Sequence, residues 1–337
     1  MSRKIKAVQY GVGAMGRVMI EMMHDKGIEI VGGIGRPTSA IIGQDLGTLA
    51  GIGPLGVVVT GDAEKTLTET KPDIAVVCIT TYLADLWPHV ELCARLGVNV
   101  VTIAEECFYP WRTEPELSRR WDALCKQNHC SAYGIGYQDF YWGNQITQLA
   151  GTCHSITSVK GFAQFNVDDY GPEVARDHMV GLTADVFAVE RKKKGNRPSY
   201  MQMVGDLIID GLGLTFKSVT EDVYQTTASQ EIFCKSLNVS LPKGIGTGNA
   251  NRTHFETLEG IPVDIEMVSK VYEPGETDQN KWEIKGRPDV SVSNERPATD
   301  ILTCTEVVSR IPDVISAPAG LLKAFEMPPI KYRRRFD

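Results

Sequence analysis

A group of closely spaced glycines near the start of the chain has the pattern of a pyrophosphate-binding turn. The segment consists of Gly11, Val12, Gly13, Ala14, Met15 and Gly16. In such a turn the first glycine permits a tight bend, the second lets backbone N–H groups approach the phosphates, and the third lets the next helix pack closely on the strand. The helix N-terminus, with Ala14 and Met15, then faces the anion. Residues 11–16 therefore predict a dinucleotide site.

The residues after the second expected strand indicate which dinucleotide is preferred. Proteins that prefer NAD place an Asp or Glu there to bind the ribose hydroxyls. This chain instead has Gly35, Arg36, Pro37, Thr38 and Ser39. A guanidinium at Arg36 can pair with a 2′-phosphate, and the hydroxyls of Thr38 and Ser39 can add donors. The pattern predicts NADP in preference to NAD; the alternative is that Arg36 is a solvated loop charge.

Two adjacent acids, Glu105 and Glu106, follow an expected strand at 98–103. A carboxylate near a cationic substrate can hold an ammonium group or act as a general base. The sequence does not show which of the two would face a site, and both could be solvated loop acids. Thr80 and Thr81 follow another expected strand, and ligands collect beyond such strand ends, so we expect both to border the cofactor.

The elements that must position these residues alternate between strand and helix. Short apolar runs predict strands, and amphipathic stretches between them predict helices, of which one starts at a capping box, Thr113 to Glu116. This alternation predicts an α/β Rossmann domain with a doubly wound parallel sheet in residues 1–150. The expected strands are 5–10, 29–34, 73–79, 98–103 and 131–134, and the expected helices are 17–26, 83–96 and about 115–128.

The remaining residues have a different pattern. Long alternating runs at 158–167, 225–241 and 262–272, with a hairpin at 282–293 and a helix at 200–212, predict an α+β domain with an open, mostly antiparallel sheet in residues 151–298. Its open sheet favours a role in binding substrate and in forming a homodimer. Residues 299–337 predict two helices, 299–310 and 317–325, that pack back on the first domain.

Composition excludes several classes of function. The 337 residues are 42% hydrophobic and 23% charged, which is typical of a globular enzyme with two domains. A net charge of −7 disfavours nucleic acid as a partner. The chain has no long apolar run and no signal-peptide core, so we expect a cytoplasmic protein without a membrane partner. The eight cysteines form no Cys-x-x-Cys pair, so we expect no metal.

Several segments resemble one family, the 2,4-diaminopentanoate dehydrogenases and their amine dehydrogenase relatives, which are similar to dihydrodipicolinate reductases. The resemblance implies that hydride leaves an amine-bearing carbon for the nicotinamide and that the imine is hydrolysed to a ketone and ammonia, or the reverse. It also implies that Glu105 or Glu106 engages the amine. The segments that carry it are Gly11 to Gly16, Val98 to Glu106 with Tyr109 and Pro110, Ile311 to Val314, Gly320 to Leu322, and Pro328 with Pro329.

The chain departs from this family after the strand at 131–134. The family has Gly-x-Gly-x-Asn-Pro-Gly-Phe beside the nicotinamide, whereas this chain has an aromatic segment that we expect to contact the substrate through Tyr137, Asp139, Phe140 and Tyr141. The aromatic residues could instead pack a domain junction. Dihydrodipicolinate reductases carry a His-His signature that this chain lacks. His254, near a glycine-rich stretch, is the remaining histidine candidate for substrate binding.

These observations favour an NADP-dependent oxidoreductase that acts on the C–NH2 group of a small amine or amino acid. One alternative is a dehydrogenase or imine reductase for an alcohol or a cyclic imine. The other is a protein that senses NADP without catalysis, because a Rossmann fold alone does not establish chemistry.

Overall fold

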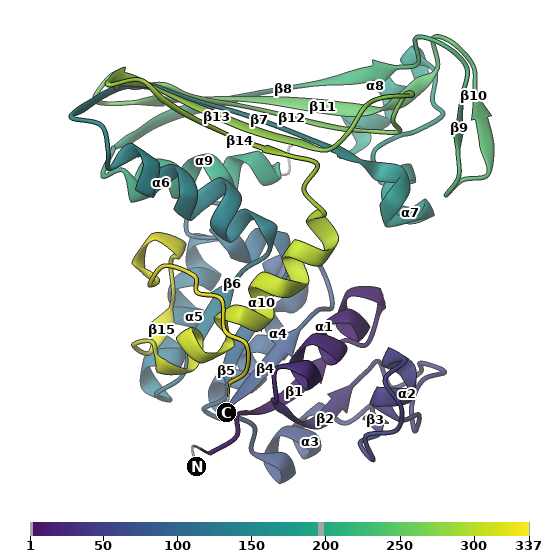
Figure 1. Ribbon diagram of the computed structural model, residues 1–337, viewed down its shortest axis with the longest axis vertical. Coiled ribbons are helices and arrows are strands. Elements are labelled where there is room, and N and C mark those ends of the chain that lie inside the picture. Colours follow the sequence, from purple (N-terminus) through teal and green to yellow (C-terminus); the bar gives the residue numbers. More distant parts are fainter. Residues whose placement is uncertain (1–2, 195–198, 337) are drawn as a thin grey trace. The chain divides into compact units, whose positions relative to one another are not determined.

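The computed structural model describes residues 3–194 and 199–336, and the chain divides into two units (Figure 1). The first unit contains Met1–Gln145 and Thr299–Asp337, and the second contains Ile146–Ala298. The chain thus leaves the first unit once and returns to it.

The first unit is built on a parallel sheet of seven strands among the described residues, in the order β15-β6-β5-β4-β1-β2-β3. Its central strand β4, Ile74–Val77, is apolar and buried at every residue because helices cover both faces of the sheet. Strand order reverses between β1 and β4, and ligands bind at such a switch point, outside the carboxyl ends of the strands. The predicted Rossmann fold is confirmed. The strands are β1 Lys6–Tyr10, β2 Glu29–Ile34, β3 Val59–Thr60, β4 Ile74–Val77, β5 Asn99–Thr102, β6 Ser131–Gly134 and β15 Gly320–Leu321.

The helices of this unit mostly follow the sequence pattern. Helix α1 buries Met19, Ile20 and Met23 on one side. The expected capping box of α5 is wrong: the helix begins with proline at Pro115, and the buried Thr113 hydroxyl has no partner among the described residues. Proline fits the first helical position because it needs no N–H there. The helices are α1 Ala14–Asp25, α2 Leu46–Ala50, α3 Ala63–Thr70, α4 Leu83–Arg95, α5 Pro115–Gln127 and α10 Thr299–Ser316.

The C-terminal region differs from the prediction of two helices. Helix α10 runs through Pro312 without a break, because burial of Ile311 and Val314 on the same side offsets the cost of an interior proline, about 3 kcal/mol. The expected helix at 317–325 is absent from the described structure. Gly320 has φ +140 and is the first residue of strand β15, which pairs with β6. A 3-10 turn follows at Ala324–Glu326.

Among its described residues, the second unit is built on a six-stranded sheet in the order β14-β13-β7-β12-β11-β8. The pair β7 and β12 is parallel and the other neighbours are antiparallel, so the sheet is mostly antiparallel as expected. The run predicted at 225–241 is not one strand: β8 ends at Thr227, and a separate two-stranded hairpin follows. The strands are β7 Ser155–Asn166, β8 Phe216–Thr227, β9 Ile232–Cys234, β10 Val239–Leu241, β11 Gly246–Thr257, β12 Val263–Lys270, β13 Gln279–Arg287 and β14 Val290–Glu295.

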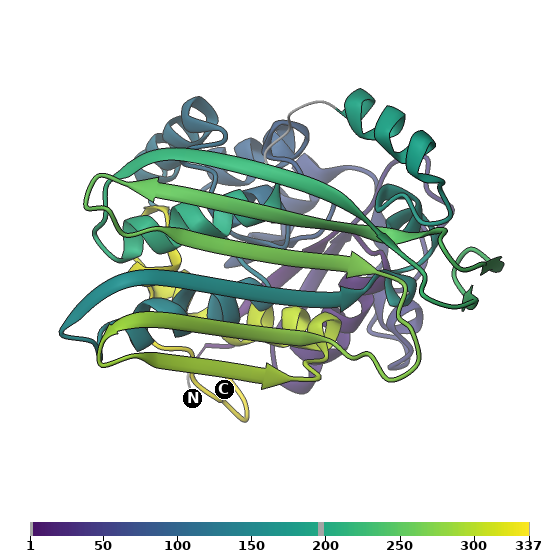
Figure 2. The ribbon, with the colours of Figure 1, turned by 90° about the horizontal axis from the view of Figure 1, so that it is seen from above.

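The two faces of this six-stranded sheet differ. Helix α9 packs on one face, where Gly205 lies so close to Phe255 that a Cβ would sit 2.1 Å from its ring. The opposite face is drawn toward the viewer in Figure 2, and no described helix of this unit lies across it. The helices of the unit are α6 Gln145–Ala150, which starts at the boundary, α7 Pro172–Asp177, α8 Ala184–Lys194 and α9 Tyr200–Gly211.

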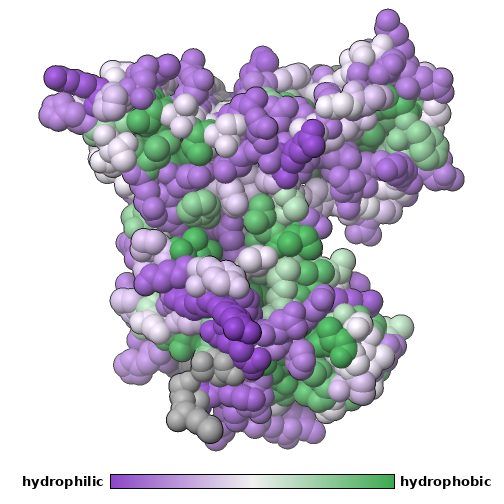
Figure 3. Space-filling model, viewed as in Figure 1, coloured by the Kyte–Doolittle hydropathy of each residue, from purple (hydrophilic) through white to green (hydrophobic). Residues whose placement is uncertain are grey.

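Within the described residues, no helix is both long enough and apolar enough to cross a membrane. Hydrophilic residues predominate on the face of the molecule drawn in Figure 3.

Candidate functional site

The glycine turn between β1 and α1 is sterically fixed. Gly11 has φ +96, and a Cβ there would lie 2.1 Å from the carbonyl oxygen of Cys78. A Cβ on Gly16 would lie 2.3 Å from the carbonyl oxygen of Gly11. Both positions therefore require glycine, one for its backbone angle and one for helix–turn packing. Gly13 is exposed, with no atom within 4 Å of its Cβ position, which leaves open space above the turn.

The start of α1 provides donors for an anion in that space. The helix begins at Ala14, and no side chain caps it at Gly13. The first intrahelical bond is from Arg17 N–H to Gly13 C=O, 3.0 Å, so the N–H groups of Ala14, Met15 and Gly16 precede it. These donors and the positive end of the helix fit a pyrophosphate. The residues present thus fit a dinucleotide.

The turn after β2 carries the residues expected to discriminate NADP from NAD. Arg36 and Thr38 are exposed and Ser39 is half-buried, and the turn is closed by a bond from Ser39 N–H to Arg36 C=O, 2.9 Å. Arg36 makes no ion pair with any described residue, so its guanidinium is available to a ligand. Gly35 N–H bonds to Thr60 C=O, 2.9 Å, which anchors the turn at the end of the neighbouring strand β3.

The structure separates the two adjacent acids. Glu106 is buried, 4% exposed, and its Oε2 accepts the N–H of Leu83, the first residue of α4, at 2.7 Å. Its own N–H bonds to Thr81 C=O, 3.1 Å. Glu106 therefore caps α4 and ties the loop of Thr80 and Thr81, half-buried and exposed respectively, to the turn after β5.

Glu105 is the acid that solvent can reach. It opens the 3-10 turn Glu105–Phe108, directly beyond the carboxyl end of β5, and its side chain is exposed. Protein atoms around the carboxyl nevertheless desolvate it and raise its pKa above the ordinary value of 4.5. A general base works best when its pKa lies near the operating pH, so this shift suits a proton-transfer role.

A lysine from the C-terminal region holds the segment after this turn. The amino group of Lys323 lies over the rings of Tyr109, Trp111 and Phe325, at 5.9, 5.4 and 5.5 Å from their centroids. Such cation–π contacts stabilise a segment through the charge of the ammonium group. The backbone that follows Glu105 is thereby fixed to the region after β15.

The aromatic segment after β6 forms a π-helical turn, Asp139–Asn144. The rings of Tyr137 and Tyr141 stack at 4.4 Å between centroids, Trp142 packs edge-on against Tyr137, and Phe140 packs edge-on against Tyr141. Single π-helical turns are rare in proteins, and those that occur are often found at functional sites. Tyr137 and Trp142 are buried, whereas Phe140 and Tyr141 are half-buried and can contact a ligand. We name residues 137–142 the aromatic turn.

Asp139 has a different position from its neighbours. It is fully buried, with Oδ2 bonded to Arg310 Nε at 2.9 Å and Oδ1 accepting the Asn144 amide at 2.8 Å and the Tyr133 hydroxyl. Burial raises the pKa of Asp139, while its three donors oppose that rise by binding the ionised form. The sequence predicts that Asp139 contacts the substrate. In the structure it instead holds the aromatic turn against α10 through Arg310.

His254 lies on β11 in the second unit, on the face opposite α9, and is exposed. Its Nδ1 is 2.6 Å from Oδ1 of Asp264 on β12. This pairing occupies one ring nitrogen. The structure records no contact between His254 and any other predicted site residue.

Three buried residues of the site were missed from the sequence: Tyr133, Glu306 and Arg310. Glu306 and Arg310 are 5% and 0% exposed on α10, among apolar positions such as Val307 and Ile311. Two charged residues four apart on an apolar helix face are a recognisable signal, because charges are rarely buried without partners.

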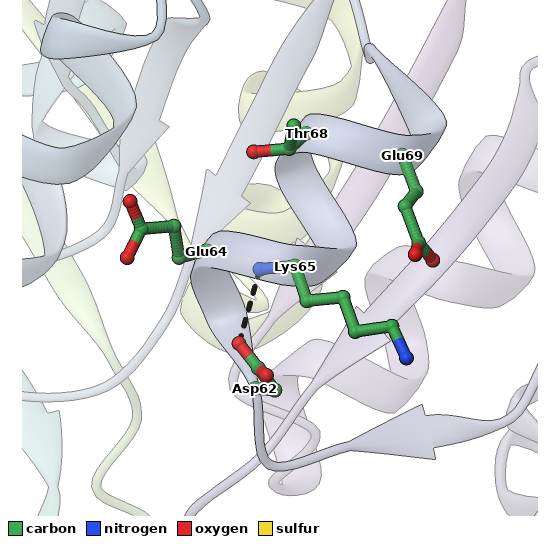
Figure 4. Close-up of a pocket in the computed structure, with 5 residues that line it drawn as sticks. All are labelled: Asp62, Glu64, Lys65, Thr68 and Glu69. Carbon is green, nitrogen blue, oxygen red and sulfur yellow. Dashed lines mark hydrogen bonds between the residues drawn. The ribbon is translucent and has the colours of Figure 1, made fainter.

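A shallow depression elsewhere in the first unit does not belong to this set of residues. It lies over α3 and is lined by Asp62, Glu64, Lys65, Thr68 and Glu69 (Figure 4). Asp62 caps the helix by accepting the Lys65 N–H at 3.0 Å, and the remaining side chains point outward. None of the predicted site residues lines it.

The fold and the glycine turn define a Rossmann-type protein with a site for a dinucleotide. Residues 5–103 match the N-terminal domain of dihydrodipicolinate reductase, and residues 140–332 match the 2,4-diaminopentanoate dehydrogenase C-terminal domain. The chain belongs to the 2,4-diaminopentanoate dehydrogenase family, and it is an enzyme of this dehydrogenase class.

Two relatives agree with this assignment, and a third structure shares the fold alone. The 2,4-diaminopentanoate dehydrogenase of Acetoanaerobium sticklandii is 25% identical over 96% of this chain and 94% of its own. The structure of an amine dehydrogenase from Mycobacterium smegmatis is 43% identical, with a TM-score of 0.92 over 99% of each chain. GenD2 from gentamicin A biosynthesis, in complex with NAD, shares the fold at 16% identity and TM-score 0.55, over 88% of this chain and 73% of its own.

Proposed function

We propose that the chain is an NADP-dependent amine dehydrogenase in which Glu105 engages the amine. The observation that carries this proposal is the separation of the two acids: Glu106 is used to cap α4, whereas Glu105 is exposed at the carboxyl edge of the sheet. The family, with relatives named for an amine and for a diamino acid, supports a C–NH2 group as the reacting centre.

In the oxidative direction, NADP held by the N–H groups at the start of α1 and by Arg36 would supply the acceptor for the hydride that leaves the carbon carrying the amine. Glu105 takes the proton that an ammonium substrate must lose before this step, and its carboxylate holds the cationic substrate first. The resulting imine adds water and releases ammonia, so a ketone, ammonia and NADPH are the products. Reductive amination is the reverse.

The aromatic turn supports recognition of the apolar part of the amine. Phe140 and Tyr141 offer partly exposed rings, and an aromatic ring can also attract the ammonium group through its π face. We assign cofactor binding to the first unit, and we assign no substrate contact to His254, because it is paired with Asp264 on the open face of the six-stranded sheet. A packed aromatic surface of this kind also excludes water from the reacting carbon.

The preference for NADP over NAD is part of the proposal. Arg36 is exposed, and no acid lies between Ile34 and Ala40 that would repel a 2′-phosphate. Thr38 and Ser39 lie in the same turn and can add hydroxyl donors.

The decisive experiment follows NADPH formation over a panel of amines and amino acids, with ammonia measured in parallel. Stoichiometric ammonia with at least one amine is expected, together with loss of turnover in Glu105→Gln. Cofactor reduction without ammonia release would contradict the amine assignment.

A second candidate substrate class is a cyclic imine or an alcohol. The observation that favours it is the π-helical aromatic turn, which replaces the family's Asn-Pro-Gly turn. Alcohols are added to the same panel, and cyclic imines are tested with NADPH by following its consumption; the candidates are separated because neither reaction releases ammonia.

We also propose that two chains pair through the open face of the six-stranded sheet. That face carries cross-strand pairs such as Arg252 with Glu266, 3.0 Å, and His254 with Asp264, and no described helix of the unit covers it (Figure 2). Sedimentation equilibrium is expected to give twice the chain mass, and a monomer at micromolar concentration would contradict this.

A further inference from the structure

One turn of helix α10 contacts both the glycine turn and the aromatic turn. Thr303 Oγ1 accepts the N–H of Tyr137 at 3.1 Å, and Cys304 Sγ lies 3.7 Å from the carbonyl oxygen of Met15. Glu306 Oε2 accepts the N–H of Phe140 at 3.1 Å. Residues 303–306 thus join the start of α1 to the turn that carries the exposed aromatic rings.

The bond from Glu306 to Phe140 gives an acceptor to a backbone N–H group at the start of the π-helical turn. Phe140 is the second residue of the π-helical turn Asp139–Asn144, and N–H groups at the start of a helix have no acceptor within it. No side chain at the preceding Gln138 caps this turn. Glu306 therefore acts as the cap from a different element, 166 residues away in sequence.

The second carboxyl oxygen of Glu306 is not used within the described chain. Oε1 is buried and has no partner among the described residues. Arg310 already forms an ion pair with Asp139 beside it and also lies 3.6 Å from Asp313. A further buried negative charge at Glu306 would therefore be uncompensated. Burial and the charge of Asp139 accordingly raise the pKa of Glu306 well above its ordinary value, which favours the neutral acid.

We propose that Glu306 is a positioning residue that holds the aromatic turn through the Phe140 N–H and thereby sets which amines the enzyme accepts. The inference rests on the proposed function, because the aromatic turn is taken to contact the amine. The neutral Glu306 side chain positions the turn by accepting the hydrogen bond from the Phe140 N–H. It is not required to be charged or to exchange a proton with substrate.

Three variants of the full chain separate this role from general stability. Glu306→Gln keeps a neutral acceptor of the same shape. Glu306→Leu keeps the bulk but removes the acceptor. Val308→Ala is the matched control, because Val308 is a buried α10 residue, 1% exposed, whose apolar side chain cannot bond to the turn.

The first measurement does not need an amine. Hydrogen exchange of the amides at 137–144 is expected to accelerate by about tenfold or more in Glu306→Leu, because a buried N–H loses its acceptor. Wild-type protection is expected in Glu306→Gln and Val308→Ala. Equal protection in all four proteins would overturn the positioning role whatever the substrate is.

The second measurement uses the wild type's best amine and a smaller homologue of it. In Glu306→Leu, we expect the KM for the larger amine to rise about tenfold or more while kcat changes less, with the NADP dissociation constant within about threefold of wild type. Glu306→Gln should match wild type in both. Loss of activity in Glu306→Gln equal to that in Glu306→Leu would overturn the neutral-acceptor role.

The two measurements also separate failure of this inference from failure of the proposed function. If the wild type turns over no amine but the exchange pattern is as expected, the amine assignment fails and Glu306 still holds the aromatic turn. If amines are substrates and Glu306→Leu keeps the selectivity of Val308→Ala, the inference fails and the proposed function stands.

Discussion

Asp139 and Arg310 form a fully buried ion pair, 2.9 Å from Oδ2 to Nε, between residues 171 positions apart in the chain. Both side chains are 0% exposed, and Arg310 also donates to the carbonyl oxygen of Pro328. The pair joins the aromatic turn, α10 and the C-terminal segment in one network. A buried pair gives little net stability, but removing one partner leaves an uncompensated charge.

Replacement of Arg310 by Met is therefore expected to lower the free energy of unfolding by about 3–5 kcal/mol. The double variant Asp139→Asn with Arg310→Met should recover part of that loss, because no buried charge remains unpaired. Urea unfolding of the wild type, both single variants and the double variant gives the coupling energy. Additive losses would show that the pair does not act as a unit.

The two acids after β5 should respond differently to the same substitution. Glu105→Gln is expected to lower kcat about 10²- to 10⁴-fold with little change in stability, because it removes a general base from an exposed position. Glu106→Gln should lose stability of about 1–2 kcal/mol by weakening the α4 cap, with a smaller loss of turnover. Steady-state kinetics and urea unfolding on both variants test this.

The pH profile provides the control for Glu105. The pKa of Glu105 is raised above 4.5, the ordinary value for a glutamate, so the ionised fraction of Glu105 should still increase as the pH rises beyond 4.5. We therefore expect kcat/KM for deamination to increase over the same pH range. That rise should be absent in Glu105→Gln and retained in Glu106→Gln. The same rise in all three proteins would assign the titration to another group.

Local pattern was enough to predict the parts of the site that depend on neighbouring residues. Gly11, Gly16 and the strands around them follow from short-range spacing, and the structure shows the steric reasons for both glycines. The sequence could not tell Glu105 from Glu106, because the difference depends on the N–H of Leu83, which is brought to Glu106 only by the parallel order of β4 and β5.

Long-range contacts account for what was missed. The role of Asp139 depends on Arg310, and the cap on Phe140 depends on Glu306, so neither follows from the segment 134–142 alone. The continuous α10 was missed for a related reason: Pro312 predicts a break, and only the burial of its neighbours outweighs that local preference.

Arg36 should control the choice between the two nicotinamide dinucleotides. Arg36→Ala is expected to raise the dissociation constant for NADP about 10- to 100-fold, the loss of one charge-assisted contact, and to leave NAD within about threefold. Lys65→Ala is a suitable control, because Lys65 is an exposed cation on the nearby helix α3. Fluorescence titration measures both ligands. Equal affinities of the wild type for NADP and NAD would contradict the assignment.

Lys323 should stabilise the segment that follows Glu105. Lys323→Met keeps most of the side-chain length but removes the charge over three rings, so we expect a loss of about 0.5–2 kcal/mol and a kcat a few times lower. The control is Lys331→Met, at an exposed position near the C-terminus. Thermal unfolding and kinetics measure the two effects, and identical values for both variants would contradict the role.

The pH dependence of stability should reveal the neutral state of Glu306. The groups around it are Asp139, Arg310, Tyr133 and Tyr141, of which only Arg310 is cationic. A carboxyl whose pKa is raised on folding contributes stability that is complete below its unfolded pKa, near 4.5, and that is lost as pH rises through the folded pKa.

Glu306→Gln removes this titration and keeps the acceptor for Phe140. The unfolding free energy of the wild type minus that of Glu306→Gln is therefore expected to fall as pH rises above about 4.5, with a slope of at most about 1.4 kcal/mol per pH unit. Subtracting the variant cancels the contributions of Asp139 and the two tyrosines to the extent that the substitution leaves them unchanged. Urea unfolding from pH 4 to 9 provides the curves. Parallel curves for the two proteins would mean that Glu306 is ionised in the folded state, with Arg310 shared between two carboxylates.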